Sequence, residues 1–174
     1  MAAVAVHDAL REACALETDI KWPNDLLAND KKLCGILAET IETPSGRAVV
    51  IGIGINLTKH SFPEEFDLVA TSVEAATGRL HELETLLDEL TAALGKHYNA
   101  LKKPTGAETI IREWCARSSY AEGKLVRVVE SNESFVGTTR GLERDGALRV
   151  ETDAGIRVVH AGDVTSLRPA QKLS

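Results

Sequence analysis

The chain has 174 residues, of which 44% are hydrophobic and 26% charged, an ordinary composition that excludes a wholly disordered protein. Its 26 acidic residues outnumber 20 basic ones and give a net charge of −6, which argues against a nucleic-acid partner because phosphate backbones attract basic surfaces. The longest apolar run, over residues 48–57, is too short to cross a bilayer, so no membrane partner is expected.

The three cysteines indicate a reducing compartment. Cys14, Cys34 and Cys115 are an odd number, widely spaced, and form neither a Cys-x-x-Cys pair nor a Cys/His ligand pattern. They are therefore expected to be buried, unpaired thiols, and zinc is not expected. The first ten residues lack the basic start of a signal peptide. We expect a cytoplasmic protein.

The first half of the chain is predicted to alternate short strands with helices. Apolar spacing predicts a helix over residues 2–15 and a strand over 18–22 that Pro23 stops, followed by turns at Asn24-Asp25 and Asn29-Asp30. Residues 32–42 carry apolar side chains on both faces, which predicts a strand inside a sheet that is covered on both sides. A turn over residues 43–46 returns the chain as a partner strand over 47–57.

The second half changes its hydrophobic period. After an irregular loop over 60–68, the capping-box spacing of residues 71–74 predicts a short helix that ends near Gly78. A 3.6-residue apolar period predicts helices over 83–101 and 107–117. From Gly123 the period becomes two, which predicts four or five short strands in a small barrel or meander. The expected boundary near residues 118–123 divides the chain into units 1–120 and 121–174.

The segment Lys21 to Glu39, KWPNDLLANDKKLCGILAE, is the first candidate for a functional site. It places two ammonium groups, an amide and a carboxylate at the ends of a strand–turn–strand. A nucleotide site needs such groups, because ammoniums bind phosphates and a carboxylate holds Mg²⁺. The alternative is that these are ordinary turn residues beside a solvated lysine, and residue types alone leave both interpretations open.

The second candidate is the segment over residues 51–56, IGIGIN. In a strand its isoleucines share one face, and Gly52, Gly54 and Asn56 share the other. Because glycine weakens a strand, two glycines on one face indicate either a flat ligand or a helix packed close to the backbone, and the pattern does not choose between them. The third glycine of a dinucleotide-binding fingerprint is missing.

Other polar and aromatic residues give weaker signals. The five histidines, at positions 7, 60, 81, 97 and 160, have no partner spacing and are expected on the surface or in packing roles. Trp22 and Trp114 are expected in the core or at the seam between the two units.

Four motifs, taken together, resemble a known family. KWPND at 21–25, KKLCGILAE at 31–39, GIGIN at 52–56 and ATS at 70–72 resemble biotin–protein ligases in order and spacing. GDVTSLRP at 162–169 is similar to the closing strand of that family's C-terminal SH3-like β-barrel. The resemblance implies an α+β fold: a class II synthetase-like catalytic sheet with helices over 1–120, and an SH3-like barrel over 121–174.

The resemblance also implies an activity. Such ligases join biotin to ATP, which forms biotinyl-5′-AMP, and then pass biotin to a lysine of the biotin carboxyl carrier domain of acetyl-CoA carboxylase or a related carboxylase. Carried over by position, Lys32 is catalytic and Asp25 is a ligand of Mg²⁺. The implied biotin site comprises Lys32, Gly35, Gly52 and Gly54, and the implied ATP site comprises Lys21, Asn24, Asp25 and Asn56.

One departure from the family pattern bears on activity, because it implies that the chain could be inactive on its own. The family's arginine- and glycine-rich loop of the GRGRxGR type has no counterpart here, since Arg11 is the only arginine before Arg47 and no glycine precedes Gly35. The chain is therefore expected to lack an N-terminal part of the catalytic domain, through a misplaced start codon or because another polypeptide supplies it. A sheet edge is then expected to be exposed, so a homodimer is possible.

Two alternatives to a biotin ligase stay open. The chain could be a non-catalytic remnant that binds biotin, an adenylate or a carrier domain. It could instead be a ligase for lipoate or another acyl acid, although KWPND and GIGIN are more similar to the biotin branch. No helix-turn-helix segment is found, so repressor activity is not expected.

Overall fold

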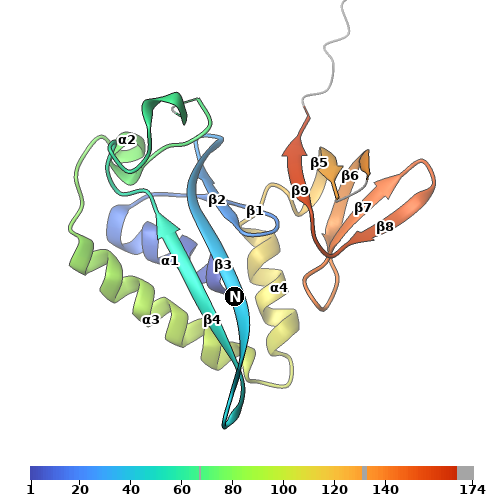
Figure 1. Ribbon diagram of the computed structural model, residues 1–174, viewed down its shortest axis with the longest axis horizontal. Helices are drawn as coiled ribbons and strands as arrows, with labels where there is room; N and C mark the ends of the chain where they lie inside the picture. Colours follow the sequence, from blue (N-terminus) through green and yellow to red (C-terminus); the bar gives the residue numbers. More distant parts are fainter. Residues whose placement is uncertain (67, 131–132, 168–174) are drawn as a thin grey trace, which may run out of the picture.

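The computed structural model describes residues 1–66, 68–130 and 133–167 and is an α+β protein with two antiparallel sheets (Figure 1). The first sheet is accompanied by helices, and the second follows α4. The elements up to α4 are α1 (Ala2–Cys14), β1 (Asp19–Lys21), β2 (Asp25–Ala28), β3 (Lys31–Thr43), β4 (Gly46–Ile55), η1 (Glu64–Phe66), α2 (Val73–Thr77), α3 (Leu83–Leu101) and α4 (Gly106–Ala116). The second sheet comprises β5 (Glu122–Val129), β6 (Ser134–Leu142), β7 (Leu148–Thr152), β8 (Gly155–Val159) and β9 (Asp163–Ser166).

The first sheet has the strand order β1-β2-β3-β4, with every neighbouring pair antiparallel. Strand β2 is a correction to the sequence analysis, which assigned Asn24-Asp25 to a turn. Asn24 does lie in the turn, but Asp25 begins β2, because it is paired with Lys21 on one side and with Gly35 on the other. The second predicted turn is confirmed, since Asn29 and Asp30 have φ angles of 52° and 61°.

The prediction that the strand over 32–42 is covered on both sides is wrong for its outer half. Leu33, Cys34 and Ile36 are buried, but Leu37 is 60% exposed and Ile41 is 44% exposed. The reason is that the far end of the β3–β4 hairpin projects beyond the helices (Figure 1). The hairpin itself is confirmed, with Thr43 paired to Gly46 at its tip.

Helix α1 packs against both α3 and α4 and carries the apolar residues at the centre of the core. The long helix over 83–101 is confirmed with its predicted bounds. The short helix α2 begins one residue later than its capping-box spacing indicated: Ser72, rather than Thr71, accepts the hydrogen bond from the Ala75 amide. The predicted end at Gly78 is confirmed by its left-handed φ of 75°.

The second sheet has the order β8-β7-β6-β5-β9 and is antiparallel throughout. Alternate valines such as Val126, Val128 and Val150 are fully buried, as the period of two requires. Over residues 122–130 and 133–167, however, β8 and β9 are not paired, so the expected closed barrel is not found. The last residues of the predicted closing strand, 168–169, lie outside the described residues.

The two sheets meet along a polar seam at β1. The Trp22 indole N–H donates to the Gly146 carbonyl at 3.0 Å, which confirms the expectation that this tryptophan contacts the seam. Ser118, in the connection after α4, donates its hydroxyl to the Ile20 carbonyl at 2.5 Å. The Ile20 amide in turn donates to the Arg117 carbonyl at 3.0 Å. Ile20 at the centre of β1 is therefore held through both its amide and its carbonyl by the connection after α4, up to 98 residues away in the sequence.

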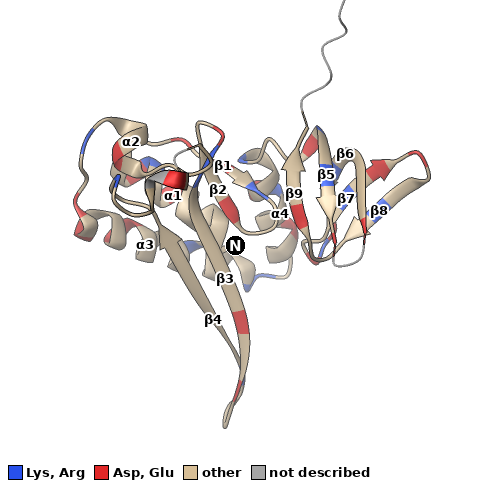
Figure 2. Cartoon of the chain, turned by 45° about the horizontal axis from the view of Figure 1, so that its top comes forward, with Lys and Arg blue, Asp and Glu red and all other residues tan. Residues whose placement is uncertain are grey.

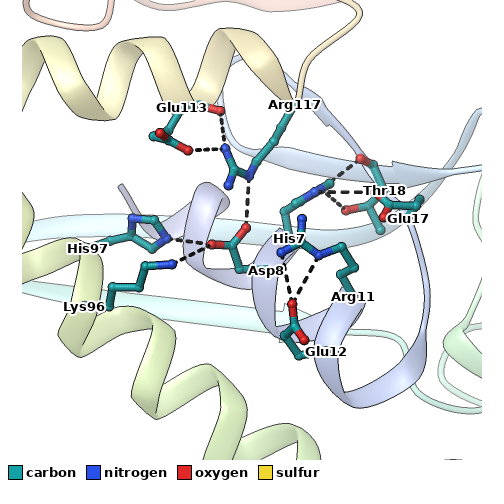
Figure 3. Close-up of polar contacts among 10 residues, drawn as sticks. All are labelled: His7, Asp8, Arg11, Glu12, Glu17, Thr18, Lys96, His97, Glu113 and Arg117. Atoms are coloured by element: carbon teal, nitrogen blue, oxygen red, sulfur yellow. Dashed lines mark hydrogen bonds and ion pairs between the residues drawn. The ribbon is translucent and has the colours of Figure 1, made fainter.

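A buried polar cluster joins the three larger helices (Figure 3). Asp8 on α1 is only 5% exposed and accepts hydrogen bonds of 2.9 Å from both His97 on α3 and Arg117 after α4. Beside it, His7 is bonded through Nδ1 to Thr18. The two buried histidines thus have specific polar partners, which the sequence analysis did not predict because the partner of His97 is 89 residues away.

The cluster sets the protonation of Asp8. Burial alone would raise the pKa of this carboxyl group, but the hydrogen bond from His97 and the charge of Arg117 outweigh burial, so its pKa lies below its ordinary value. A lowered pKa stabilises the fold at pH values above the pKa of the unfolded chain, about 3.9 for aspartate. This stabilisation is lost as the pH falls below that value.

In the ranges that the structure covers, no helix has both the length and the apolar character needed to cross a membrane.

We predict that Asp8→Asn lowers the free energy of unfolding by about 3 kcal/mol at pH 7, because the largely buried Arg117 guanidinium loses one of its two acidic partners, Asp8 and Glu113. Urea unfolding followed by circular dichroism at pH 7 and pH 3 measures this. The difference from wild type should shrink at pH 3, because this pH lies below the pKa of aspartate in the unfolded chain and the stabilisation by the lowered pKa of Asp8 is then reduced. Asp88→Asn on the exposed face of α3 is the matched control, and an equal loss in both variants would contradict a role for the cluster.

Candidate functional site

Four of the predicted site residues lie in one row across the first sheet. Lys21 on β1 is paired with Asp25 on β2, Asp25 with Gly35 on β3, and Gly35 with Gly54 on β4. Directly opposite residues in antiparallel strands point to the same face, so the row places a cation, a carboxylate and two bare backbone positions side by side. These residues are spread over 34 positions of the sequence and meet only through strand pairing.

A β-bulge brings Lys32 to the same face. In a regular strand Lys32 would point away from Gly35, because the two residues are three positions apart. The β2–β3 register shifts between Leu26 and Leu27, so Leu27 pairs with Lys32 and Leu33 is left as the extra residue. A bulge of this kind redirects the side chains that follow it. The Lys32 ammonium consequently lies 2.6 Å from the Asp25 carboxylate.

In the Asp25–Lys32 ion pair the carboxylate is largely buried and the lysine side chain is half-exposed. The Asp25 side chain is 16% exposed, whereas that of Lys32 is 51% exposed. Gly35 leaves space for the lysine to fold back, since a Cβ atom at this position would lie 3.3 Å from Lys32 Cε. Asp25 therefore positions an ammonium group that remains accessible to a ligand.

The glycine face of β4 is open rather than packed. An ideal Cβ atom on Gly52 would meet only the Leu37 carbonyl oxygen, and one on Gly54 only the Gly35 carbonyl oxygen, each at 3.8 Å. Among the residues described, no helix atom lies within 4 Å of either Cβ position, so a helix packed on the glycines is ruled out. The isoleucines of β4 are partly buried on the opposite, helix-facing side, as predicted. Figure 2 shows the glycine-bearing part of β4 without acidic or basic residues.

The two asparagines are bound to the protein backbone. Asn24 donates its side-chain amide to the Ile36 carbonyl at 2.7 Å. Asn56 donates its amide to the Thr71 carbonyl at 3.0 Å. This hydrogen bond uses the nitrogen of the Asn56 side-chain amide. Its oxygen accepts no hydrogen bond from a protein group within the described part of the chain. Asn56 thus follows the end of β4 directly and has an acceptor available.

Lys21 lies at the seam between the two sheets. Its ammonium group is 3.7 Å from the Asp163 carboxylate on β9, and its side chain is 17% exposed. The backbone of Lys21 belongs to the row, but its ammonium group forms an ion pair with a residue of the second sheet. The sequence analysis did not predict this partner, which lies 142 positions away in the sequence.

Residues 69–71, which follow the irregular loop predicted over 60–68, pair with the backbone of Lys32. The Lys32 amide donates to the Val69 carbonyl at 2.8 Å, and the Thr71 amide donates to the Lys32 carbonyl at 2.9 Å. Residue Ala70 is therefore paired with Lys32 in a parallel bridge. The ATS motif at 70–72 was the one sequence signal for this contact.

The described residues contain no group of three or more His, Cys, Asp or Glu side chains arranged to hold a metal ion. Asp25 is the carboxylate in the row. One carboxylate matches the way Mg²⁺ is held when most of its ligands come from water and from substrate phosphates.

The fold and the row define an α+β protein whose first sheet presents an ammonium–carboxylate pair beside a bare glycine face. Two family models match the chain: the biotin/lipoate A/B protein ligase family over residues 1–56, and the biotin protein ligase C-terminal domain over residues 123–165. A biotin–[acetyl-CoA-carboxylase] ligase of Paracoccus denitrificans is 35% identical over 170 residues, which cover 94% of this chain and 70% of that protein. The chain belongs to the biotin protein ligase family, which confirms the resemblance in the sequence.

Two further relatives show how much of a ligase the chain represents. The bifunctional ligase/repressor BirA of Bacillus subtilis is 35% identical over 167 residues, which cover 94% of this chain and 51% of that protein. A biotin–[acetyl-CoA-carboxylase] ligase of Mycobacterium tuberculosis is 37% identical over 175 residues, which cover 96% of this chain and 61% of that protein. The chain thus spans about half the length of the Bacillus relative.

Solved structures support the fold. The apo biotin protein ligase of Aquifex aeolicus superposes with a TM-score of 0.82 at 24% identity, over 97% of this chain and 73% of that one. The same enzyme in complex with biotin and ATP gives a TM-score of 0.80, over 97% of this chain and 69% of that one. At this identity the likeness establishes the arrangement of both sheets and the helices.

We predict that Gly54→Ala changes the free energy of unfolding by no more than about 0.5 kcal/mol, because the new methyl group enters open space. Gly137→Ala in β6 should instead lower it by about 2 kcal/mol, since its methyl group would overlap the Glu151 carbonyl and lie 2.6 Å from Val150 Cγ1. Urea unfolding of both variants makes the comparison. A large decrease in the free energy of unfolding of Gly54→Ala would show that the glycine face is packed.

Proposed function

We propose that the chain carries out the biotin–protein ligase reaction. Biotin and ATP form biotinyl-5′-AMP and pyrophosphate, and biotin then passes to a lysine of a biotin carboxyl carrier domain, as in acetyl-CoA carboxylase. The observation that carries the proposal is the row Lys21–Asp25–Gly35–Gly54 with Lys32 folded onto it, because it joins anion-binding groups to a face that a ligand can approach closely. The names of the relatives from Paracoccus and Mycobacterium support this assignment.

In the first step a biotin carboxylate oxygen forms a bond to the α-phosphorus of ATP, and pyrophosphate leaves. We assign Lys32 to the biotin carboxylate and the α-phosphate, where a fixed ammonium group stabilises the negative charge that builds up during the displacement. Its ion pair with Asp25 restricts where the ammonium can lie, and this reduces the cost of ordering it when the ligand binds. Gly35, Gly52 and Gly54 form the floor beneath the ligand.

ATP is assigned to the polar ends of the same face. The free acceptor oxygen of Asn56 suits a donor such as the adenine amino group. Lys21, Asn24 and Asp25 are assigned to the side of the phosphates. The single carboxylate of Asp25 fits a Mg²⁺ ion that phosphate oxygens and water also ligate, and the ion would neutralise phosphate charge when bound.

In the second step the carrier lysine attacks the biotinyl carbonyl carbon, and AMP leaves. We propose that residues 1–120 form the catalytic unit and that 121–174 form the SH3-like unit. The open five-stranded sheet and the match to the C-terminal domain model over residues 123–165 support the second assignment. The chain has three unpaired cysteines, of which Cys14 and Cys34 are buried, and this supports a location in the reducing cytoplasm.

We predict biotin-dependent exchange of labelled pyrophosphate into ATP, lowered about 100-fold or more by Lys32→Ala, because removing a preorganised cation costs several kcal/mol in the transition state. The assay measures ATP–pyrophosphate exchange with and without biotin. Lys59→Ala, which alters an exposed lysine in the segment beside the site, is the matched control. Equal exchange by the Lys32 variant and wild type would remove Lys32 from the catalytic role.

The same measurements separate the alternatives. Calorimetric binding of biotin without any exchange would identify a binding protein in place of a ligase. Tighter binding of lipoate than of biotin would overturn the choice of acyl acid.

We predict that Gly54→Val weakens biotin binding at least about tenfold, because a branched side chain would fill the space above the sheet. Gly54→Ala should have a smaller effect, so that the loss grows with side-chain volume. Isothermal titration calorimetry measures both, with urea unfolding as the check that the variants are folded. Unchanged affinity in the valine variant would place biotin elsewhere.

A further inference from the structure

His7 on α1 is almost completely buried, yet it lies at the edge of a cleft. Its side chain is only 5% exposed. The cleft has a volume of about 550 Å³ and is lined by residues of α1, of the connection from α1 to β1, and of the segment after α4. Figure 3 shows His7 beside Thr18 and Glu17, the two residues of that connection that it contacts. The proposed ligase chemistry gives this histidine no role.

The contacts of His7 determine which of its ring nitrogens carries the proton. Nδ1 lies 2.9 Å from the Thr18 carbonyl oxygen, which can only accept a hydrogen bond, so Nδ1 is the donor. Burial and the charge of Arg117 outweigh the carboxylates of Glu17 and Asp8 and hold the pKa of His7 below its ordinary value. The ring is therefore neutral at pH 7, and Nε2 carries a lone pair. Histidine ligands of metal ions commonly have this combination of a bare nitrogen and an outer hydrogen bond to a carbonyl.

A second acceptor stands opposite this lone pair. Nε2 lies 3.6 Å from a carboxylate oxygen of Glu17, and no protein group among the described residues donates a hydrogen bond to Nε2. Two acceptors that face each other repel unless a proton, a water molecule or a cation lies between them. An ion about 2.1 Å from both atoms would bind them at an angle of about 120°, close to the ~109° of a tetrahedral site. The Glu17 side chain is 74% exposed and is free to adjust to that angle.

The charge around the cleft favours the cation. The two arginines that line it are already paired with carboxylates: Arg117 with Asp8 and Glu113, and Arg11 with Glu12. Glu17 and Asp19 also line the cleft, and in the part of the chain that the structure describes neither has a lysine or arginine nitrogen within 4 Å. Both oxygens of Asp19 accept hydrogen bonds from Ser119, so Glu17 supplies the carboxylate that can bind an ion.

We propose that Nε2 of His7 and the carboxylate of Glu17 bind a divalent transition-metal ion of the Zn²⁺ type, with water in the remaining positions. The imidazole disfavours Mg²⁺ and Ca²⁺, which prefer oxygen ligands, so this site differs from the Mg²⁺ site assigned to Asp25. It uses none of the cysteines, whose spacing predicted no zinc. With two protein ligands it is consistent with the lack of three-residue groups among the described residues. The inference is independent of the proposed ligase activity.

Isothermal titration calorimetry of the chain with ZnCl₂ at pH 7, in a buffer without chelators, tests the proposal. Wild type should bind one ion with a dissociation constant in the micromolar range, and millimolar Mg²⁺ should not compete. Glu17→Gln should raise the dissociation constant at least about tenfold, and this exposed residue can be changed without disturbing the core. His7→Asn should raise it at least as much, because asparagine can still donate to Thr18 but has no counterpart of Nε2. Urea unfolding checks that both variants are folded.

His160 provides a matched control. Its Nδ1 also lies 3.6 Å from a carboxylate, that of Asp145, but both side chains are largely exposed. His160→Asn should leave the dissociation constant unchanged, and so should Cys115→Ser, which removes the most accessible thiol. Binding weaker than about 1 mM in wild type overturns the proposal. A control variant that weakens binding as much as Glu17→Gln identifies an adventitious ion only and overturns it as well.

Long-range ¹H–¹⁵N spectra of the imidazole rings read the tautomer of His7 directly. In the metal-free chain Nδ1 should be protonated and Nε2 bare, and Zn²⁺ should shift the Nε2 resonance of His7. A proton on Nε2 in the metal-free chain, or a zinc-dependent shift confined to the other histidines, would overturn the proposal.

Discussion

The β-bulge at Leu33 is the constraint on which the candidate site depends. Without the extra residue, the alternation of β3 would direct Lys32 away from Asp25 and Gly35. The bulge is held in place because Leu33 itself is fully buried and because Lys32 is paired through its backbone with the segment at Val69 and Thr71. Packing of one apolar side chain thus determines where the accessible ammonium group lies, 2.6 Å from its carboxylate partner.

The features of the candidate site that could be predicted from the sequence are those that follow from the local alternation of residue types. The alternation over 51–56 predicted an isoleucine face and a glycine face, and the structure has both. The motifs also predicted which residues gather around the glycines. Periodicity does not encode the register between strands. Strand pairing alone places four of these residues in one row: Lys21, Asp25, Gly35 and Gly54. Strand β2 was itself missed because turn-forming residues stand at its start.

Long-range polar contacts were beyond the reach of the sequence for a different reason. His97 and Asp8 each have ordinary helical neighbours, and only the packing of α3 on α1 brings them within 2.9 Å. The same holds for Lys21 and Asp163, which meet because β9 lies beside β1 at the seam. A single sequence carries no signal for pairs of this kind, since either residue alone is typical of an exposed position.

The open glycine face of β4 differs from the exposed apolar side chains elsewhere, such as those on α3, in what it can accommodate. On the glycine face, backbone is bare and flanked by charged groups, so a small ligand with an anionic end satisfies both the apolar and the polar parts. On α3 the exposed leucines at positions 83 and 87 are interspersed with exposed polar residues such as Glu84 and Asp88. The glycine face is therefore the surface whose chemistry suits a small ligand, because bare backbone and an accessible ammonium group lie side by side there.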